Sequence, residues 1–172
     1  MSNTERARPP AGAFAFGASL LTRTVSAGLI SFAAVAGLLL GIGHRAGTPW
    51  RLLNASAHLI IGARADGVWN FQQDVTPTGC LVVLVLSMMA GFVAACVTAS
   101  RRTPYVILAA VGVALAGYFL HLNLAARTPG GLAALLSVGE LRALYVTLAV
   151  ALAVGIRLAL PAAEGSRSQP LG

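Results

Sequence analysis

Charged residues are scarce in this chain. They make up 10% of its 172 residues, whereas soluble domains have about 25%. Hydrophobic residues account for 57%, and the mean hydropathy is +0.80. Such a chain cannot cover itself with polar side chains, so the composition excludes a soluble domain and indicates a membrane protein. Its length allows a single domain.

Lysine is absent, and all 12 basic residues are arginine. This bias is typical of a GC-rich, prokaryotic genome. The arginines are scattered along the chain and do not form a cluster with aromatic residues. In spite of the net charge of +7, we therefore expect no nucleic-acid partner.

Cysteine pairs and catalytic motifs are also missing. Cys80 and Cys96 are both predicted on one helix and would lie about 24 Å apart, too far for a disulfide. The chain has no Cys-x-x-Cys pair, no Gly-x-Ser-x-Gly and no His-Glu-x-x-His motif. The apolar runs contain no paired carboxylates, and their middles contain no charge, which argues against an enzyme and a transporter. We predict no catalytic residue and no diagnostic metal site.

Long apolar runs are what the sequence does contain. Four runs, at about 24–43, 79–99, 104–126 and 140–160, are long enough to cross a hydrocarbon core of about 30 Å. The predicted fold is an all-α membrane protein, with four transmembrane helices bundled within residues 22–160. Residues 1–21 are predicted as a mobile tail with an apolar lead-in, and 161–172 as a mobile tail.

The long connection between the first two spans contains another predicted helix. Over residues 49–65, Leu53, Ala57, Ile60 and Ile61 recur at helical spacing, and Arg51, Asn54 and His58 share another face. The segment is too short to span, so we expect an amphipathic helix that lies along the membrane surface or dips into it.

The distribution of arginine predicts the orientation. Seven arginines would lie on the side of the two termini and five on the other side, and the short turn at Arg101 and Arg102 strengthens this bias. We expect a multi-pass protein of the inner membrane with both termini in the cytoplasm.

Two stripes of small residues are candidate helix-packing surfaces. Such residues allow helix backbones to approach closely inside lipid. The first span has Ala33, Gly37 and Gly41 at four-residue spacing, and the second has Ser87, Gly91 and Ala95. The stripes would pack the bundle internally, or join it to other membrane subunits or to a second copy of the chain.

Polar side chains gather near the predicted outer end of the bundle. His44, His58, His121 and Tyr118 are the candidate cofactor-binding residues. A haem would need two axial imidazoles at one depth, but His44 and His121 differ by about 8 Å. A quinone or lipid headgroup would need only one or two donors, which His121 and Tyr118 offer. Alternatively, His121 binds no ligand and only hydrogen-bonds a neighbouring helix or the long loop.

The sequence favours a non-catalytic accessory or structural subunit of a larger membrane complex. The alternative is an electron-transfer module that binds haem, quinone or a metal on the outer side through His121. The sequence itself requires no cofactor. Haem or quinone would be the cofactor only in the alternative.

Overall fold

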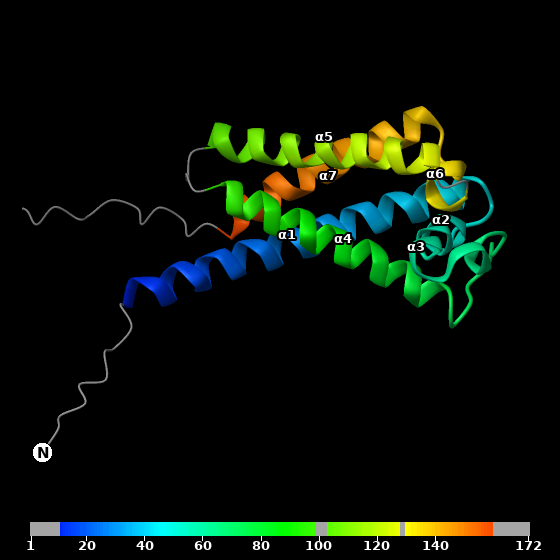
Figure 1. Ribbon diagram of the computed structural model, residues 1–172, viewed down its shortest axis with the longest axis horizontal. Helices are drawn as coiled ribbons and strands as arrows, with labels where there is room; N and C mark the ends of the chain where they lie inside the picture. Colours follow the sequence, from blue (N-terminus) through cyan, green and yellow to red (C-terminus); the bar gives the residue numbers. More distant parts are fainter. Residues whose placement is uncertain (1–10, 99–102, 128–129, 160–172) are drawn as a thin grey trace, which may run out of the picture.

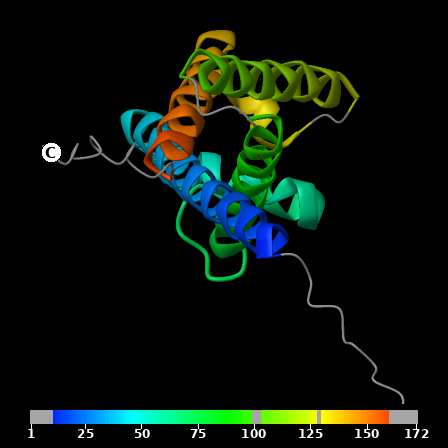
Figure 2. The same cartoon turned by 90° about the vertical axis from the view of Figure 1, so that its left-hand side faces the viewer.

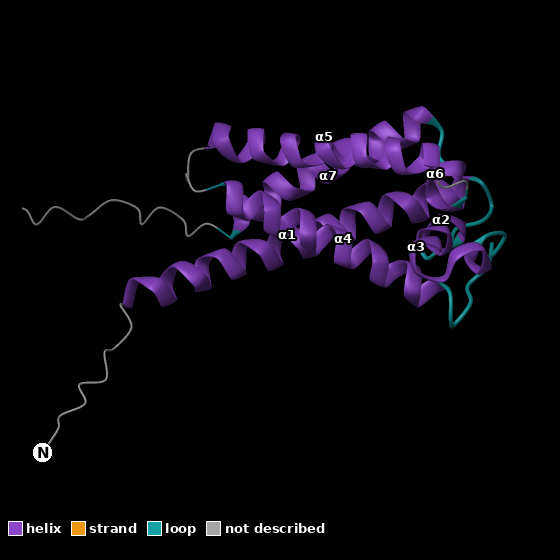
Figure 3. Ribbon diagram, viewed as in Figure 1, coloured by secondary structure: helices purple, strands orange, loops and turns teal. Residues whose placement is uncertain are grey.

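A computed structural model describes residues 11–98, 103–127 and 130–159, and this part of the chain is helical, without strands (Figures 1 and 3). The four long helices are α1 (Ala11–Arg45), α4 (Thr76–Val97), α5 (Thr103–Arg127) and α7 (Val138–Leu158). Each contains a stretch of 21 to 27 residues apolar and long enough to cross a membrane. The prediction of four transmembrane helices in one bundle is thus confirmed.

The ends of the chain differ in part from the expected layout. The lead-in 11–21, predicted within the N-terminal tail, is helical and continues into the first span as part of α1. Residues 1–10, the turn with Arg101 and Arg102, and the predicted tail 161–172 lie outside the described residues.

The four long helices form an open row rather than a closed square. α1 packs against both α4 and α7, and α5 packs mainly against α7. The order in space is therefore α4, α1, α7, α5, although α4 and α5 are consecutive in the chain. α4 and α5 touch each other less than each touches its main neighbour, and Figure 2 shows α5 across the top of the bundle, away from α1.

Small residues allow α1 to lie close to both neighbours. A Cβ atom on Gly91 of α4 would lie 2.8 Å from the backbone nitrogen of Gly28, and one on Gly155 of α7 would lie 2.5 Å from Cα of Ala27. The Ser26 hydroxyl also donates a hydrogen bond of 2.9 Å to the Gly155 carbonyl. Backbones at such distances gain dispersion contacts that lipid cannot supply.

The two predicted small-residue stripes lie in different surroundings. Ser87, Gly91 and Ala95 are buried, and Gly91 is where α4 meets α1. Ala33, Gly37 and Gly41 are exposed, and a Cβ on either glycine would meet no atom within 4 Å. The stripe of Ala33, Gly37 and Gly41 therefore faces away from the other described helices of this chain.

The segment after α1 forms a short bent helix instead of one straight helix. It consists of α2 (Arg51–Ser56), α3 (His58–Ile61) and the 3₁₀ turn η1 (Gly62–Ala65), and α6 (Gly131–Leu135) lies beside it. Arg51 lies over the Trp69 ring at 5.1 Å, and Trp50 packs edge-on against Phe71 at 5.4 Å. The predicted extra helix is present, with a bend.

Asn54 is the unexpected residue of this bent helix. The sequence pattern placed it on a polar face with Arg51 and His58, yet it is fully buried. Its amide donates to the carbonyls of Val68 (3.0 Å) and Asn70 (2.9 Å), and its oxygen accepts from Thr76 Oγ1 (2.7 Å). The loop before α4 folds back over Asn54. Its backbone carbonyls therefore accept the hydrogen bonds that the pattern would assign to water.

Candidate ligand cavity between α4 and α5

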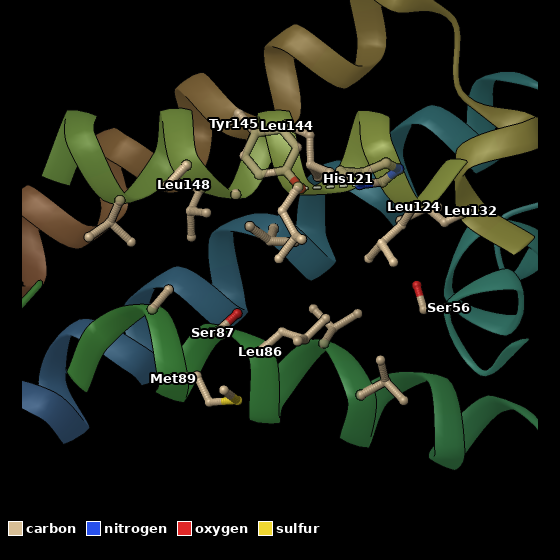
Figure 4. A pocket seen from close by; sticks show the side chains of 18 of the residues that line it. Ser56, Leu86, Ser87, Met89, His121, Leu124, Leu132, Leu144, Tyr145 and Leu148 are labelled. Atoms are coloured by element: carbon tan, nitrogen blue, oxygen red, sulfur yellow. Dashed lines mark hydrogen bonds between the residues drawn. The ribbon is translucent and has the colours of Figure 1, made fainter. Parts of the chain in front are cut away.

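The space between α4 and α5 is a cavity of about 830 Å³. Side chains of both helices point into it, α1 and α7 contribute to its walls, and the bent helix and α6 line one end (Figure 4). The α4 residues on its wall are Val82, Val83, Leu86, Ser87, Met89, Ala90, Val93 and Val97. The α5 residues are Tyr105, Leu108, Ala109, Gly112, Val113, Ala116, Gly117, Leu120, His121 and Leu124.

Small residues on α5 keep this space open. Ala109, Gly112 and Ala116 recur at helical spacing along the cavity wall, and a Cβ on Gly112 would meet no atom within 4 Å. Because these positions carry almost no side chain, α5 does not fill the gap toward α4. The cavity extends along α5 from Tyr105 to Leu124, a rise of about 28 Å.

Most polar side chains of the wall lie at the loop end, apart from Ser87 on α4 and Tyr105 at the opposite end. His121, Tyr145, His58 and Ser56 lie at the loop end, whereas most of the remaining wall is apolar. None of the described lining residues is Arg, Asp or Glu. The described chain also has no cluster of three or more His, Cys, Asp or Glu side chains.

His121 and Tyr145 form a hydrogen-bonded pair across two helices. Nδ1 of His121 on α5 lies 3.1 Å from the Tyr145 hydroxyl on α7, and the two rings meet edge to face (Figure 4). Gly117 makes room for this pair, because a Cβ there would lie 2.9 Å from Cε1 of Tyr145. Nε2 of His121 is buried and has no hydrogen-bond partner.

A second polar contact closes the loop end. Nδ1 of His58 lies 2.9 Å from Oδ1 of Asp66, and the same carboxylate oxygen accepts a 3.3 Å hydrogen bond from the Gly131 backbone. Gly130, with φ +119°, packs so close to His58 that a Cβ would lie 2.9 Å from the imidazole. These contacts fasten the start of α6 onto the bent helix.

Comparisons with protein-family models, with curated proteins and with solved structures give no match. The function must therefore be argued from the cavity itself.

The structure brings only two of the four predicted cofactor-binding residues to the cavity. His121 and His58 line it, whereas His44 is exposed at the end of α1 and Tyr118 lies behind the wall, with its ring 5.6 Å from that of Tyr145. Tyr145 was missed by the sequence analysis. The signal for it was weak: an aromatic hydroxyl inside an apolar run, at a depth similar to that of His121.

Proposed function

We propose that this integral membrane protein binds a lipophilic molecule in the cavity between α4 and α5. The observation that supports this proposal is the cavity itself: about 830 Å³, apolar over most of its wall, with a few polar groups at one end. Ligand pockets have volumes of about 300–1,000 Å³ and a similar distribution of polarity.

The cavity is open along part of its length, so its wall is accessible from outside the bundle. Water is a poor filler, because it needs 2–4 polar partners and most of this wall offers none. A hydrocarbon occupant restores the missing dispersion contacts.

The length of the cavity suits an extended hydrocarbon chain. It runs for about 28 Å along α5 past a mostly apolar wall, and a chain lying along it makes dispersion contacts over that whole length.

Gly112→Leu tests this proposal, because the new side chain would enter the open space at the cavity wall. The protein is purified in a mild detergent, washed, extracted with organic solvent and analysed by mass spectrometry. We expect a bound lipophile at a fixed ratio to wild-type protein, and a severalfold lower ratio for Gly112→Leu.

Gly37→Leu is the matched control, since Gly37 also faces open space on a membrane-spanning helix but lies outside the cavity. It should retain the lipophile. Equal retention by all three proteins would contradict the proposal.

An accessory role in a membrane assembly is a second candidate function. It is supported by the exposed stripe of Ala33, Gly37 and Gly41, which offers a close-packing surface to another helix. Gly37→Leu should then abolish co-purification of a partner or of a second copy, while Gly112→Leu should not. A wild-type protein that runs as a monomer without a partner would contradict this role.

We propose the inner membrane as the location, with both termini in the cytoplasm. The arginine bias supports this orientation. Single cysteines introduced at Gly47 and Gly67, in a variant without Cys80 and Cys96, should react with an impermeant thiol reagent added to intact cells. Labelling only after cell lysis would contradict this orientation.

A further inference from the structure

We propose that the lipophile is a quinone: a flat ring that carries carbonyl groups at the His121–Tyr145 pair, with an apolar tail along α5 toward Tyr105. This inference rests on the proposed function and names the class of its ligand. Three properties of the cavity support it, namely its charge, its hydrogen-bond count and its length.

The wall favours an uncharged headgroup. Its described residues include no arginine, although arginine is the basic residue of this chain. Among the described lining residues, none carries a positive charge that would neutralise a phosphate or carboxylate at the depth of His121, and burial of an unpaired charge is strongly unfavourable. His58 is no substitute, because its Nδ1 already faces the carboxylate of Asp66 at 2.9 Å.

The His121–Tyr145 pair has one hydrogen to spare. A neutral imidazole and a phenol together carry two polar hydrogens, and their mutual bond uses one. If the phenol donates to Nδ1, the spare N–H is at Nε2, which is buried and out of reach of the cavity space. If Nδ1–H donates, the spare donor is the phenol O–H of Tyr145, a residue of the cavity wall. In this second tautomer the pair can donate to a carbonyl oxygen, which is the polar group of a quinone.

The geometry around the pair suits a ring with a tail. The adjoining turn of α5 has Ala116 on the cavity wall, so a position without a long side chain lies next to the donor. From His121 to Tyr105 the cavity continues for about 24 Å along an apolar wall, enough for a long extended tail.

The test compares two probes: a benzoquinone with a ten-carbon tail and a benzene with the same tail but without carbonyls. Binding is measured at equilibrium with radiolabelled probes and protein in lipid nanodiscs. The central variant is the double substitution His121→Leu with Tyr145→Phe. Replacing both partners by apolar groups of similar shape is nearly neutral for folding, whereas each single substitution leaves one polar hydrogen in place.

We expect the double variant to bind the quinone three- to tenfold more weakly than the wild type, the range expected for one lost hydrogen bond. The carbonyl-free probe should bind with unchanged affinity, which also shows that the cavity is folded. His44→Leu, which removes an imidazole outside the cavity, is the control and should bind both probes like the wild type.

Each failure has its own meaning. If the double variant binds the quinone as tightly as the wild type, or loses both probes alike, the quinone class is wrong while the lipophilic cavity stands. If wild-type protein binds neither probe, or Gly112→Leu binds both normally, the proposed function fails, and the quinone with it.

Discussion

Substitution of Asn54 by leucine should loosen the loop end of the cavity. Leucine has a similar size, so the change removes mainly hydrogen bonds: two from the amide to the Val68 and Asn70 carbonyls, and one from the Thr76 hydroxyl. At about 0.5–1.5 kcal/mol each, three bonds correspond to roughly 1.5–4.5 kcal/mol. The loss in the free energy of unfolding should exceed the lower limit of this range, because Asn54 and Thr76 are buried and water cannot replace the lost partners.

The two tryptophans of the protein make this loss measurable. Trp50 and Trp69 both lie in the segment that Asn54 organises, so intrinsic fluorescence reports on this segment. Reversible unfolding with increasing denaturant should give a midpoint for Asn54→Leu well below that of the wild type. Asn70→Ala is the control: its side chain is exposed and its carbonyl is retained, so the change should stay within about 0.5 kcal/mol. Equal midpoints for Asn54→Leu and the wild type would refute the reasoning.

Further substitutions test close packing at two glycines and the N-cap of α7. Gly79→Ala should lower the midpoint in the same unfolding assay, because the new Cβ would collide with the backbone of α2. Gly139→Ala is its control: the new Cβ meets open space, so the protein should be unchanged or more stable by up to about 1 kcal/mol. Gly117→Ala should displace the Tyr145 ring and weaken quinone binding at least threefold, while the carbonyl-free probe binds as before; equal quinone binding would contradict the role of that contact. Ser137→Ala removes the N-cap of α7 and should cost about 1 kcal/mol, measured as a lower midpoint and restored in part by Ser137→Asp.

The four spans were predictable because length and apolarity suffice for a transmembrane helix. Which face of each helix packs inward was not, because lipid-facing and protein-facing surfaces are both apolar in a membrane. The stripes at Gly37 and Gly91 look equivalent in the sequence. One faces away from the bundle and the other contacts α1, a difference that depends on which helices become neighbours.

The candidate site was only partly predictable for a similar reason. His121 stands out as a titratable residue inside an apolar run, and the structure places it on the cavity wall. The cavity itself depends on α4 and α5 separating although a short connection joins them, and no local pattern encodes that separation. Asn54 shows the same limit, because helical spacing marks a polar face but not whether water or a folded-back loop satisfies it.

The contact between α1 and α7 joins the first and the fourth long helix of the described chain. Helices enter the bilayer individually and associate afterwards, so one side of α1 lacks its neighbour until α7 has been inserted. Because α5 packs mainly against α7, a nascent chain that stops before Val138 would keep the α1–α4 pair and lack the main neighbour of α5. Insertion of α7 is therefore the step after which all four long helices can take their places.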